Sequence, residues 1–173
     1  IDNGTTALIV AQSSVGGSLT LTSGNVSGIT DSGTVTVGGN LAATTDANSG
    51  LINLGTLAVD GTVQLTTNAS GNATVVNDAG LNFAESTVGG NLAATASANN
   101  ITDDGALTVA GTSSFTTSAN NADITLNNTN AFTGAVTLST TGSTGNATID
   151  NGTTALIVAQ SSVGGSLTLT SGN

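Results

Sequence analysis

Short runs of alternating apolar and polar residues fill this chain, and each run is centred on a glycine two residues after an apolar side chain, usually in the pattern Val-x-Gly. Seven such corner glycines occur, namely Gly17, Gly39, Gly61, Gly90, Gly111, Gly134 and Gly165. Glycine suits a sharp turn between strands because it tolerates positive φ and lets two backbones approach closely. The pattern therefore predicts short strands separated by glycine corners.

The apolar residues before the corners predict a core column. They are Val15, Val37, Val59, Val88, Val109, Phe132 and Val163. Aliphatic residues also prevail two and four positions after each corner. Side chains of a strand alternate between its faces with a period of two, so these positions all point to the same side. Apolar residues do not recur at the i, i+3, i+4 spacing of a helix, which favours strands throughout.

Hydroxyl side chains occupy the opposite parity, five positions after the corner. This predicted hydroxyl ladder comprises Thr22, Thr44, Thr66, Thr95 and Thr116. Rows of threonines on a flat solenoid face can bind ice, so an ice- or surface-binding face is an alternative interpretation. Such faces need paired Thr-x-Thr rows, whereas only Thr20 and Thr22 form such a pair here. A solvated outer β-surface is the favoured interpretation.

The chain also repeats itself on a larger scale. Residues 149–173 copy residues 1–25 letter for letter at an offset of 148 positions. This period divides into two quasi-repeats of similar length, which span 13–85 and 86–160. Repeats at a fixed spacing indicate a solenoid or fibre. We interpret residues 1–148 as one period of a tandem array and 149–173 as the start of the next, in a single continuous solenoid that extends beyond both ends.

The spacing of the corners predicts the size of one coil. Most corner glycines follow one another at intervals close to that from Gly17 to Gly39, and only the intervals from Gly61 to Gly90 and from Gly134 to Gly165 are clearly longer. This gives about six coils per period. We expect an all-β fold, a parallel β-helix or β-solenoid with three short strands per coil, and loops near residues 68–85 and 141–160 where the intervals are longer.

The expected coils have consequences for the length and the stability of the solenoid. At about 4.8 Å per coil, one period of six coils would advance the axis by about 29 Å. A single coil has only a few aliphatic side chains to bury, and their burial cannot offset the backbone entropy that the coil loses on folding. Stability must therefore come from the stacking of coils.

Composition narrows the functional classes. The chain has no Lys, Arg, His, Cys, Pro, Met, Trp or Tyr, and ten carboxylates give it a net charge of −10. Because it has no cations to neutralise phosphates, we expect no nucleic-acid partner. No run is apolar enough to predict membrane insertion. The usual general bases and nucleophiles are missing, so we expect no enzymatic activity.

Carboxylates are the remaining candidate chemistry. The best candidates for a calcium site are Asp103 and Asp104 together with Asp31 of the preceding half-repeat. Calcium needs several converging oxygen ligands, and the nonapeptide of calcium-binding β-rolls is absent. Most of the acids lie beside Gly or Asn, where aspartate favours turns. Turn chemistry is the favoured interpretation, with calcium as the alternative and no other cofactor expected.

Four runs carry a resemblance to known proteins: residues 122–143 (ADITLNNTNAFTGAVTLSTTGS), 161–172 (SSVGGSLTLTSG), 101–117 (ITDDGALTVAGTSSFTT) and 88–95 (VGGNLAAT). In this phrasing the chain resembles filamentous-haemagglutinin-like giant bacterial exoproteins, which are β-strand-repeat surface proteins, over essentially its whole length. The resemblance implies a parallel β-helix, export across the outer membrane, and a role in adhesion, aggregation or surface filaments.

The expected function is therefore structural: a rigid β-solenoid rod in an extracellular, cell-surface filament or adhesin stalk that serves attachment, aggregation or matrix. The expected partners are further copies of the same repeat, covalently linked or stacked end to end, and neighbouring filaments or cell surfaces. The alternative is a binding module that uses one solenoid face to recognise ice, a carbohydrate or a partner cell.

Overall fold

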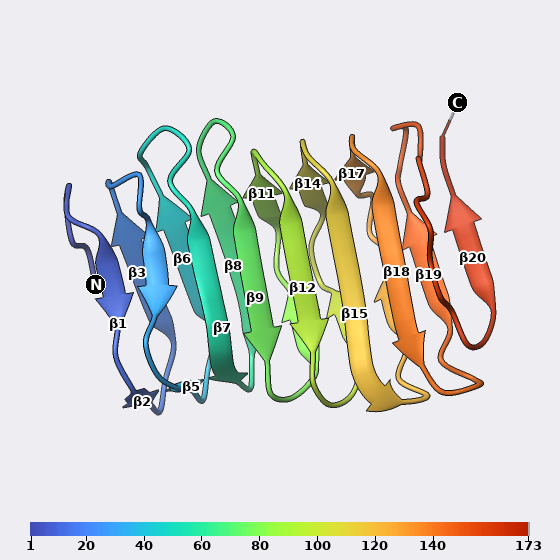
Figure 1. Ribbon diagram of the computed structural model, residues 1–173, viewed down its shortest axis with the longest axis horizontal. Helices are drawn as coiled ribbons and strands as arrows, with labels where there is room; N and C mark the ends of the chain where they lie inside the picture. The colour runs from blue at the N-terminus through green and yellow to red at the C-terminus, as the bar shows by residue number, and fades with distance from the viewer. Residues whose placement is uncertain (173) are drawn as a thin grey trace.

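The computed structural model describes residues 1–172 as a β-solenoid of about eight turns. Successive coils lie side by side along one axis, with the N-terminus at one end of the rod and the C-terminal strand at the other (Figure 1). Within residues 1–172 every regular element is a strand, and all the strand pairs are parallel. The predicted parallel β-solenoid is confirmed.

Two sheets form the walls of the rod. The first sheet contains β1 (Leu8–Val10), β2 (Ser13–Val15), β4 (Ile29–Asp31), β5 (Val35–Val37), β7 (Ile52–Val59), β9 (Ala73–Asn77), β12 (Leu92–Ala96), β15 (Ser113–Asn120) and β18 (Val136–Thr141). The second contains β3 (Leu19–Ser23), β6 (Leu41–Thr45), β8 (Thr62–Thr67), β10 (Leu81–Phe83), β11 (Ser86–Val88), β13 (Ile101–Asp103), β14 (Leu107–Val109), β16 (Ile124–Leu126), β17 (Ala131–Phe132), β19 (Ala147–Asp150) and β20 (Leu167–Thr170).

Strand pairing in the first sheet gives the length of a coil. One column of directly paired residues runs through Leu8, Ile29, Ile52, Ala73, Leu92, Ser113, Val136 and Val158. We number the coils from these residues, so that coil 1 spans 8–28, coil 2 29–51, coil 3 52–72, coil 4 73–91, coil 5 92–112, coil 6 113–135, coil 7 136–157 and coil 8 158–172. Seven steps lead from position 8 to position 158, and the coils are therefore of nearly equal length.

The predicted count of six coils per period is thus too low by one, because the long intervals between corner glycines are not loops. Each is about one and a half coils. Residues 68–85 contain β9 and β10, and residues 141–160 contain β19. Seven coils at about 4.8 Å each advance the axis by about 34 Å per period, rather than about 29 Å.

The extra half coil moves the strand pattern from one wall to the other. In coils 1–3 the strands β3, β6 and β8 of five or six residues lie in the second sheet, whereas in coils 4–7 the long strands β9, β12, β15 and β18 lie in the first. The long strand β7 of coil 3 is in the first sheet, where it takes the places of two short strands and pairs with both β4 and β5. The shorter strands change walls in the opposite sense. Each of the quasi-repeats 13–85 and 86–160 therefore equals three and a half coils. Two quasi-repeats make seven coils and bring the pattern back to its original wall.

The core is one continuous apolar cluster between the two sheets. Three phenylalanines fill its middle: Phe115 meets Phe83 edge-on with ring centroids 6.4 Å apart, and Phe132 with centroids 5.5 Å apart. Coil 5 contributes the small side chains Ala94 and Ala96 beside them. The bulky rings thus compensate for a coil with little volume of its own, which keeps the interior filled.

Ser113 is a polar residue in this core. It occupies the column between Leu92 and Val136, is 2% exposed, and its Oγ has no hydrogen-bond partner among residues 1–172. A buried hydroxyl without a partner costs about 1–3 kcal/mol. We therefore expect Ser113→Ala to stabilise the protein by about 1 kcal/mol, measured as a higher urea midpoint. The matched control is Ser114→Ala, whose side chain lies on the outer face. A Ser113→Ala midpoint at or below that of the control would contradict this assignment.

Candidate functional site

The predicted core column is two columns rather than one. Val15, Val37 and Val59 pair in the first sheet. Val88, Val109 and Phe132 pair in the second sheet, and Val163 is partly buried in coil 8. The column does not continue from Val59 to Val88 because the step between them is about one and a half coils instead of one. All six paired residues face inward, since a shift between walls leaves the alternation of side chains unchanged.

The hydroxyl ladder divides in the same way. Thr22, Thr44 and Thr66 pair in the second sheet, and Thr95 and Thr116 pair in the first. The first group continues, in a way not predicted from the sequence, from Thr66 to Thr87 and Thr108. A usable signal was available, because each of these two threonines directly precedes a valine of the core column. Five threonines thus form one outer row across coils 1–5.

The corner glycines serve close approach, not a left-handed backbone. Gly4, Gly28, Gly142 and Gly152 are the glycines with positive φ in the described chain, and none of them is a corner. A Cβ on Gly111 would lie 2.6 Å from the carbonyl oxygen of Gly90, one coil earlier. A Cβ on Gly134 would lie 2.5 Å from the carbonyl carbon of Gly111. Successive corners therefore nest against each other through their backbones.

Gly134→Ala is expected to destabilise the rod by about 2 kcal/mol, because the added methyl overlaps backbone that cannot rotate away. Gly17 offers a matched control. It is also a corner glycine, yet a Cβ there would meet no atom within 4 Å. We expect Gly17→Ala to leave the thermal midpoint within about 1 °C and Gly134→Ala to lower it by several degrees. Equal effects of the two substitutions would refute close approach as the reason for the corners.

Amide side chains next to the corners link one coil to the next. The Oδ1 of Asn40 accepts the N–H of Thr62 at 3.0 Å, and the Oδ1 of Asn91 accepts the N–H of Thr112 at 2.8 Å. Ser18 makes an analogous link in the preceding coil, where its hydroxyl accepts the N–H of Asn40 at 3.1 Å. Backbone donors at the corners are thus satisfied by the preceding coil.

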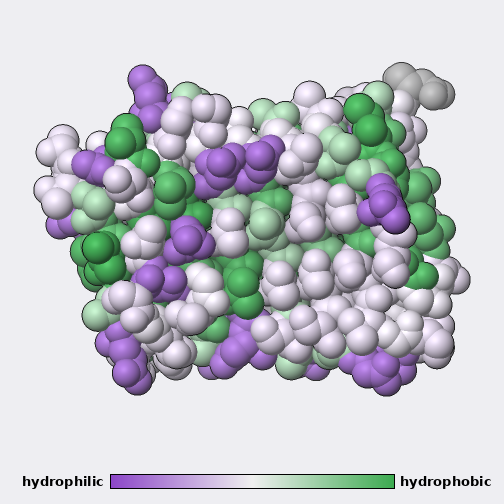
Figure 2. All heavy atoms as spheres, viewed as in Figure 1, coloured by the Kyte–Doolittle hydropathy of each residue, from purple (hydrophilic) through white to green (hydrophobic). Residues whose placement is uncertain are grey.

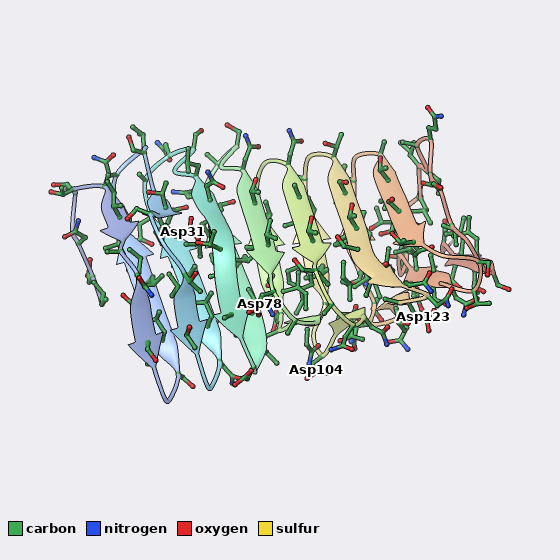
Figure 3. All side chains as sticks on the ribbon, turned by 60° about the horizontal axis from the view of Figure 1, so that its bottom comes forward. Asp31, Asp78, Asp104 and Asp123 are labelled. Atoms are coloured by element: carbon green, nitrogen blue, oxygen red, sulfur yellow. The ribbon has the colours of Figure 1, made fainter. Side chains whose placement is uncertain are left out.

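The structure does not bring the calcium candidates together. Asp31 lies in coil 2, whereas Asp103 and Asp104 lie three coils further along the rod, and Figure 3 shows Asp31 and Asp104 far apart on it. Over residues 1–172 no three Asp or Glu side chains are grouped in a way that could hold a metal ion. Because each quasi-repeat is three and a half coils long, Asp31 lies in the first sheet and Asp103 in the second.

These carboxylates instead receive backbone donors from the following coil. Asp31 Oδ2 accepts the N–H and the hydroxyl of Thr56 at 2.7 and 2.9 Å. Asp103 is 6% exposed, and its Oδ1 accepts the N–H of Asn127 at 3.0 Å while its Oδ2 accepts the Nδ2 of Asn130 at 2.9 Å. Asp31 and Asp103 hold equivalent places in the two quasi-repeats, ITDSG and ITDDG. Asp31 thus fixes the irregular middle of β7, and Asp103 fixes the bend between β16 and β17, in each case in the next coil.

Asp104 has a different role. Its Oδ2 accepts the Nδ2 of Asn82 at 2.8 Å, and the Oδ1 of Asn82 in turn accepts the hydroxyl of Thr102 at 3.1 Å. The side chains of Asn82 and Thr102 border a shallow groove that Asp60 also lines. The amide of Asn82 and the hydroxyl of Thr102 thus already have hydrogen-bond partners within the protein.

Two buried asparagines, which were not predicted from the sequence, mark the half-coil steps. Asn77 Oδ1 accepts the N–H of Val59 at 2.8 Å, and its Nδ2 donates to the carbonyl oxygens of Val59 at 3.0 Å and of Gly80 at 2.6 Å. Asn151 makes the same pair of contacts with Phe132, at 2.7 and 3.2 Å. Val59 and Phe132 are the last residues of their two columns. Beyond Val59 and Phe132 the next strand of the column lies in the other sheet. The side-chain amide of the asparagine therefore makes the hydrogen bonds that the peptide group of that strand would otherwise make.

We call Asn77 and Asn151 the joint asparagines. Both are at most 1% exposed. Asn3 precedes Asn77 by the same interval by which Asn77 precedes Asn151, and it donates its Nδ2 to the carbonyl oxygen of Ala7 at 2.8 Å. The sequence signal was the recurrence of Asn at this spacing, which is hidden in a chain so rich in asparagine.

The repeat pattern matches a known family model, described as repeats of unknown function (DUF5649), over residues 1–55 and 70–139. The chain belongs to this family. No curated protein and no solved structure matches the chain. Among residues 1–172 no helix is long and apolar enough to cross a membrane.

Proposed function

We propose that this DUF5649 repeat is a structural module, a rigid rod in an extracellular bacterial surface filament or adhesin stalk that serves attachment, aggregation or matrix. The observation that carries the proposal is the return of the same sequence segment to the same walls after seven coils. Leu19 and its copy Leu167 both lie in the second sheet. The seven coil steps from Leu8 to Val158 cover two positions more than the sequence period of 148. Because this difference is even, inward side chains stay inward and periods can be joined without a break in the core.

The backbone hydrogen bonds between coils and the apolar core explain why such a rod would be stiff. Backbone hydrogen bonds run along the axis from coil to coil, and the apolar cluster extends from coil 1 to coil 7 without interruption. In a repeat protein each coil gains most of its stability from its neighbours. Bending the rod would break backbone hydrogen bonds between coils on one wall. The acidic surface, in turn, keeps neighbouring rods apart by electrostatic repulsion.

Chains with one, two or three periods joined in register test the proposal. We expect the maximum dimension from small-angle scattering to rise by about 34 Å for each added period, at constant cross-section. A compact or flexible particle, in which the dimension rises much less than this, would overturn the rod.

The surface-binding alternative draws on the continuous outer row of Thr22, Thr44, Thr66, Thr87 and Thr108. A glycan site is less well supported, because all three phenylalanines are fully buried and leave no aromatic platform. Ice recrystallisation assays decide the alternative: inhibition by the wild type that is lost in Thr66→Lys would favour a binding face. The absence of inhibition by the wild type would remove this candidate.

Chelation of divalent ions is expected to leave the thermal midpoint of the isolated rod unchanged. The carboxylate oxygens of Asp31, Asp103 and Asp104 already accept hydrogen bonds from the protein. A drop of several degrees on adding EDTA, reversed by calcium but not by sodium, would contradict this and restore the calcium alternative.

A further inference from the structure

The carboxylates are distributed unevenly over the two walls of the rod. The strands β3, β6 and β8 of coils 1–3 in the second sheet, and β9, β12, β15 and β18 of coils 4–7 in the first, contain no Asp or Glu. On the opposite walls, Asp31 ends β4 in coil 2, and the exposed Glu85 and Asp104 lie between the short strands of coils 4 and 5. Four further acids lie in the connections between the sheets, namely Asp46, Asp60, Asp78 and Asp123.

The outward side chains of the strands without carboxylates form two uncharged faces. The first neutral face lies on β9, β12, β15 and β18, and its directly paired rows are Thr74, Ala93, Ser114, Thr137 and Val76, Thr95, Thr116, Ser139. The second neutral face lies on β3, β6 and β8, and its rows are Thr20, Ala42, Gln64 and Thr22, Thr44, Thr66. Figure 2 shows the side of the rod that carries the first neutral face, with pale, moderately polar side chains over β12 and β15.

The half-coil step places the two neutral faces on opposite sides of the rod, because one lies on each wall. Each quasi-repeat contributes one face, so the centres of the two faces are three and a half coils apart along the axis. At about 4.8 Å per coil this offset is about 17 Å. In a tandem array, neutral faces therefore alternate between the two sides of the rod along its whole length.

We propose that the neutral faces are lateral contact surfaces, through which one rod binds a second copy on each side and rods assemble into a layer one rod thick. The contact rests on the proposed rod function and gives the rods a means of aggregation. Two rods with a net charge of −10 per chain repel each other wherever their carboxylates meet. This repulsion disfavours every other approach and leaves the neutral faces as the sites where two copies can come close.

The spacing of the coils also favours a second copy as the partner. Rows of side chains recur about every 4.8 Å along the axis of each rod. When two parallel or antiparallel rods meet, the side chains of one coil can enter the groove between two coils of the other, and this match is kept over every coil in contact. The hydroxyl groups of Thr and Ser both donate and accept, so they can form hydrogen bonds with the same groups of the other rod.

A single contact of this kind is small. Four strands with about five residues each cover about 300 Å² on each partner, which is less than half of the roughly 800 Å² per partner of a stable interface. Contacts in successive periods act together, since the first contact holds the others at a high effective concentration. Lateral association should therefore strengthen steeply with the number of periods.

The number of periods provides the first test. By sedimentation, we expect a chain of three joined periods to associate at a concentration at least tenfold lower than the 173-residue chain. Sodium chloride should promote the association, because at 1 M it shortens the range of the carboxylate repulsion to about 3 Å. Equal association of the two chains, as end-to-end stacking would give, or association that weakens as sodium chloride is added, would overturn the lateral contact.

Glutamate substitutions in every period of the three-period chain provide the second test. Thr95→Glu places a charge in the first neutral face and Thr44→Glu in the second. Each single variant should stop at pairs of rods in 1 M sodium chloride, because only one face remains, and the double variant should stay unassociated. Thr108→Glu and Thr36→Glu are the matched controls, since they add the same charge at outward positions of the same coils on the opposite walls.

We expect the control variants to associate like the wild type. Controls that lose association as completely as the face variants, or a double variant that still associates, would each overturn the neutral faces as contacts. Thermal midpoints of all variants show that they remain folded. If joined periods still lengthen the particle by about 34 Å each in low salt, such a result removes the lateral contact and leaves the rod standing.

Discussion

Asn77→Leu should split the unfolding of this protein into two transitions. The leucine removes both hydrogen bonds to Val59 and the one to Gly80, and leaves the buried backbone groups of Val59 and the half-buried carbonyl of Gly80 without partners. Each orphaned group costs about 1–3 kcal/mol, so we expect a total loss of about 3–5 kcal/mol at this joint. In a stacked repeat such a loss falls on one interface between coils. Coils 1–3 are then expected to unfold at a lower urea concentration than coils 4–8.

Asn53→Leu is the matched control for this prediction. Asn53 is an exposed residue of β7 that points outward, so the same substitution there should change stability by less than about 0.5 kcal/mol. Asn77→Asp provides a second comparison, because it keeps the acceptor but loses the donor to two carbonyl oxygens and should destabilise at least as much. Hydrogen exchange resolved by coil would show which side of the joint opens first. One cooperative transition at the wild-type midpoint would mean that Asn77 does not couple the quasi-repeats.

The half-coil steps at the joint asparagines also show what could not be predicted from the sequence. Inward and outward positions were predictable, because alternation along a strand is a local property that Val37 and Thr44 show within a few residues. The wall to which a strand belongs was not predictable from that pattern, since an inward valine looks the same on either sheet. A long interval, such as that from Gly61 to Gly90, fits a coil with a loop as well as one and a half coils.

The polar residues were harder to assign for a related reason. Asp31, Asp103 and Asn77 act on backbone groups of neighbouring coils, 18 to 25 residues away along the chain. No sequence neighbour reveals such a partner before the coil length is known. Once the coil length is known, the recurrence of Asn77 as Asn151 becomes a structural signal. The coil length also shows that the carboxylates of Asp31 and Asp103 lie next to backbone groups of the following coil, where they fix bends and do not gather as calcium ligands.

Phe115→Ala is the second substitution with a large expected effect. The ring is fully buried, pairs in the ladder between Ala94 and Leu138, and contacts Phe83 and Phe132 edge-on. Truncation of a buried phenylalanine to alanine costs about 3–5 kcal/mol. We expect a loss at the upper end of this range, because the small side chain of Ala94 beside it cannot close the cavity.

The size dependence of this loss separates packing from a specific aromatic contact. Phe115→Leu keeps most of the volume and should cost about 1–2 kcal/mol if filling the core is what counts. Ala94→Leu in the Phe115→Ala background adds volume from the neighbouring coil and should recover some of the stability. Urea denaturation of these variants and the wild type measures both effects. If Phe115→Leu were as damaging as Phe115→Ala, the edge-on rings rather than the volume would stabilise the middle of the rod, since an aromatic pair contributes about 0.5–1.5 kcal/mol beyond its buried area.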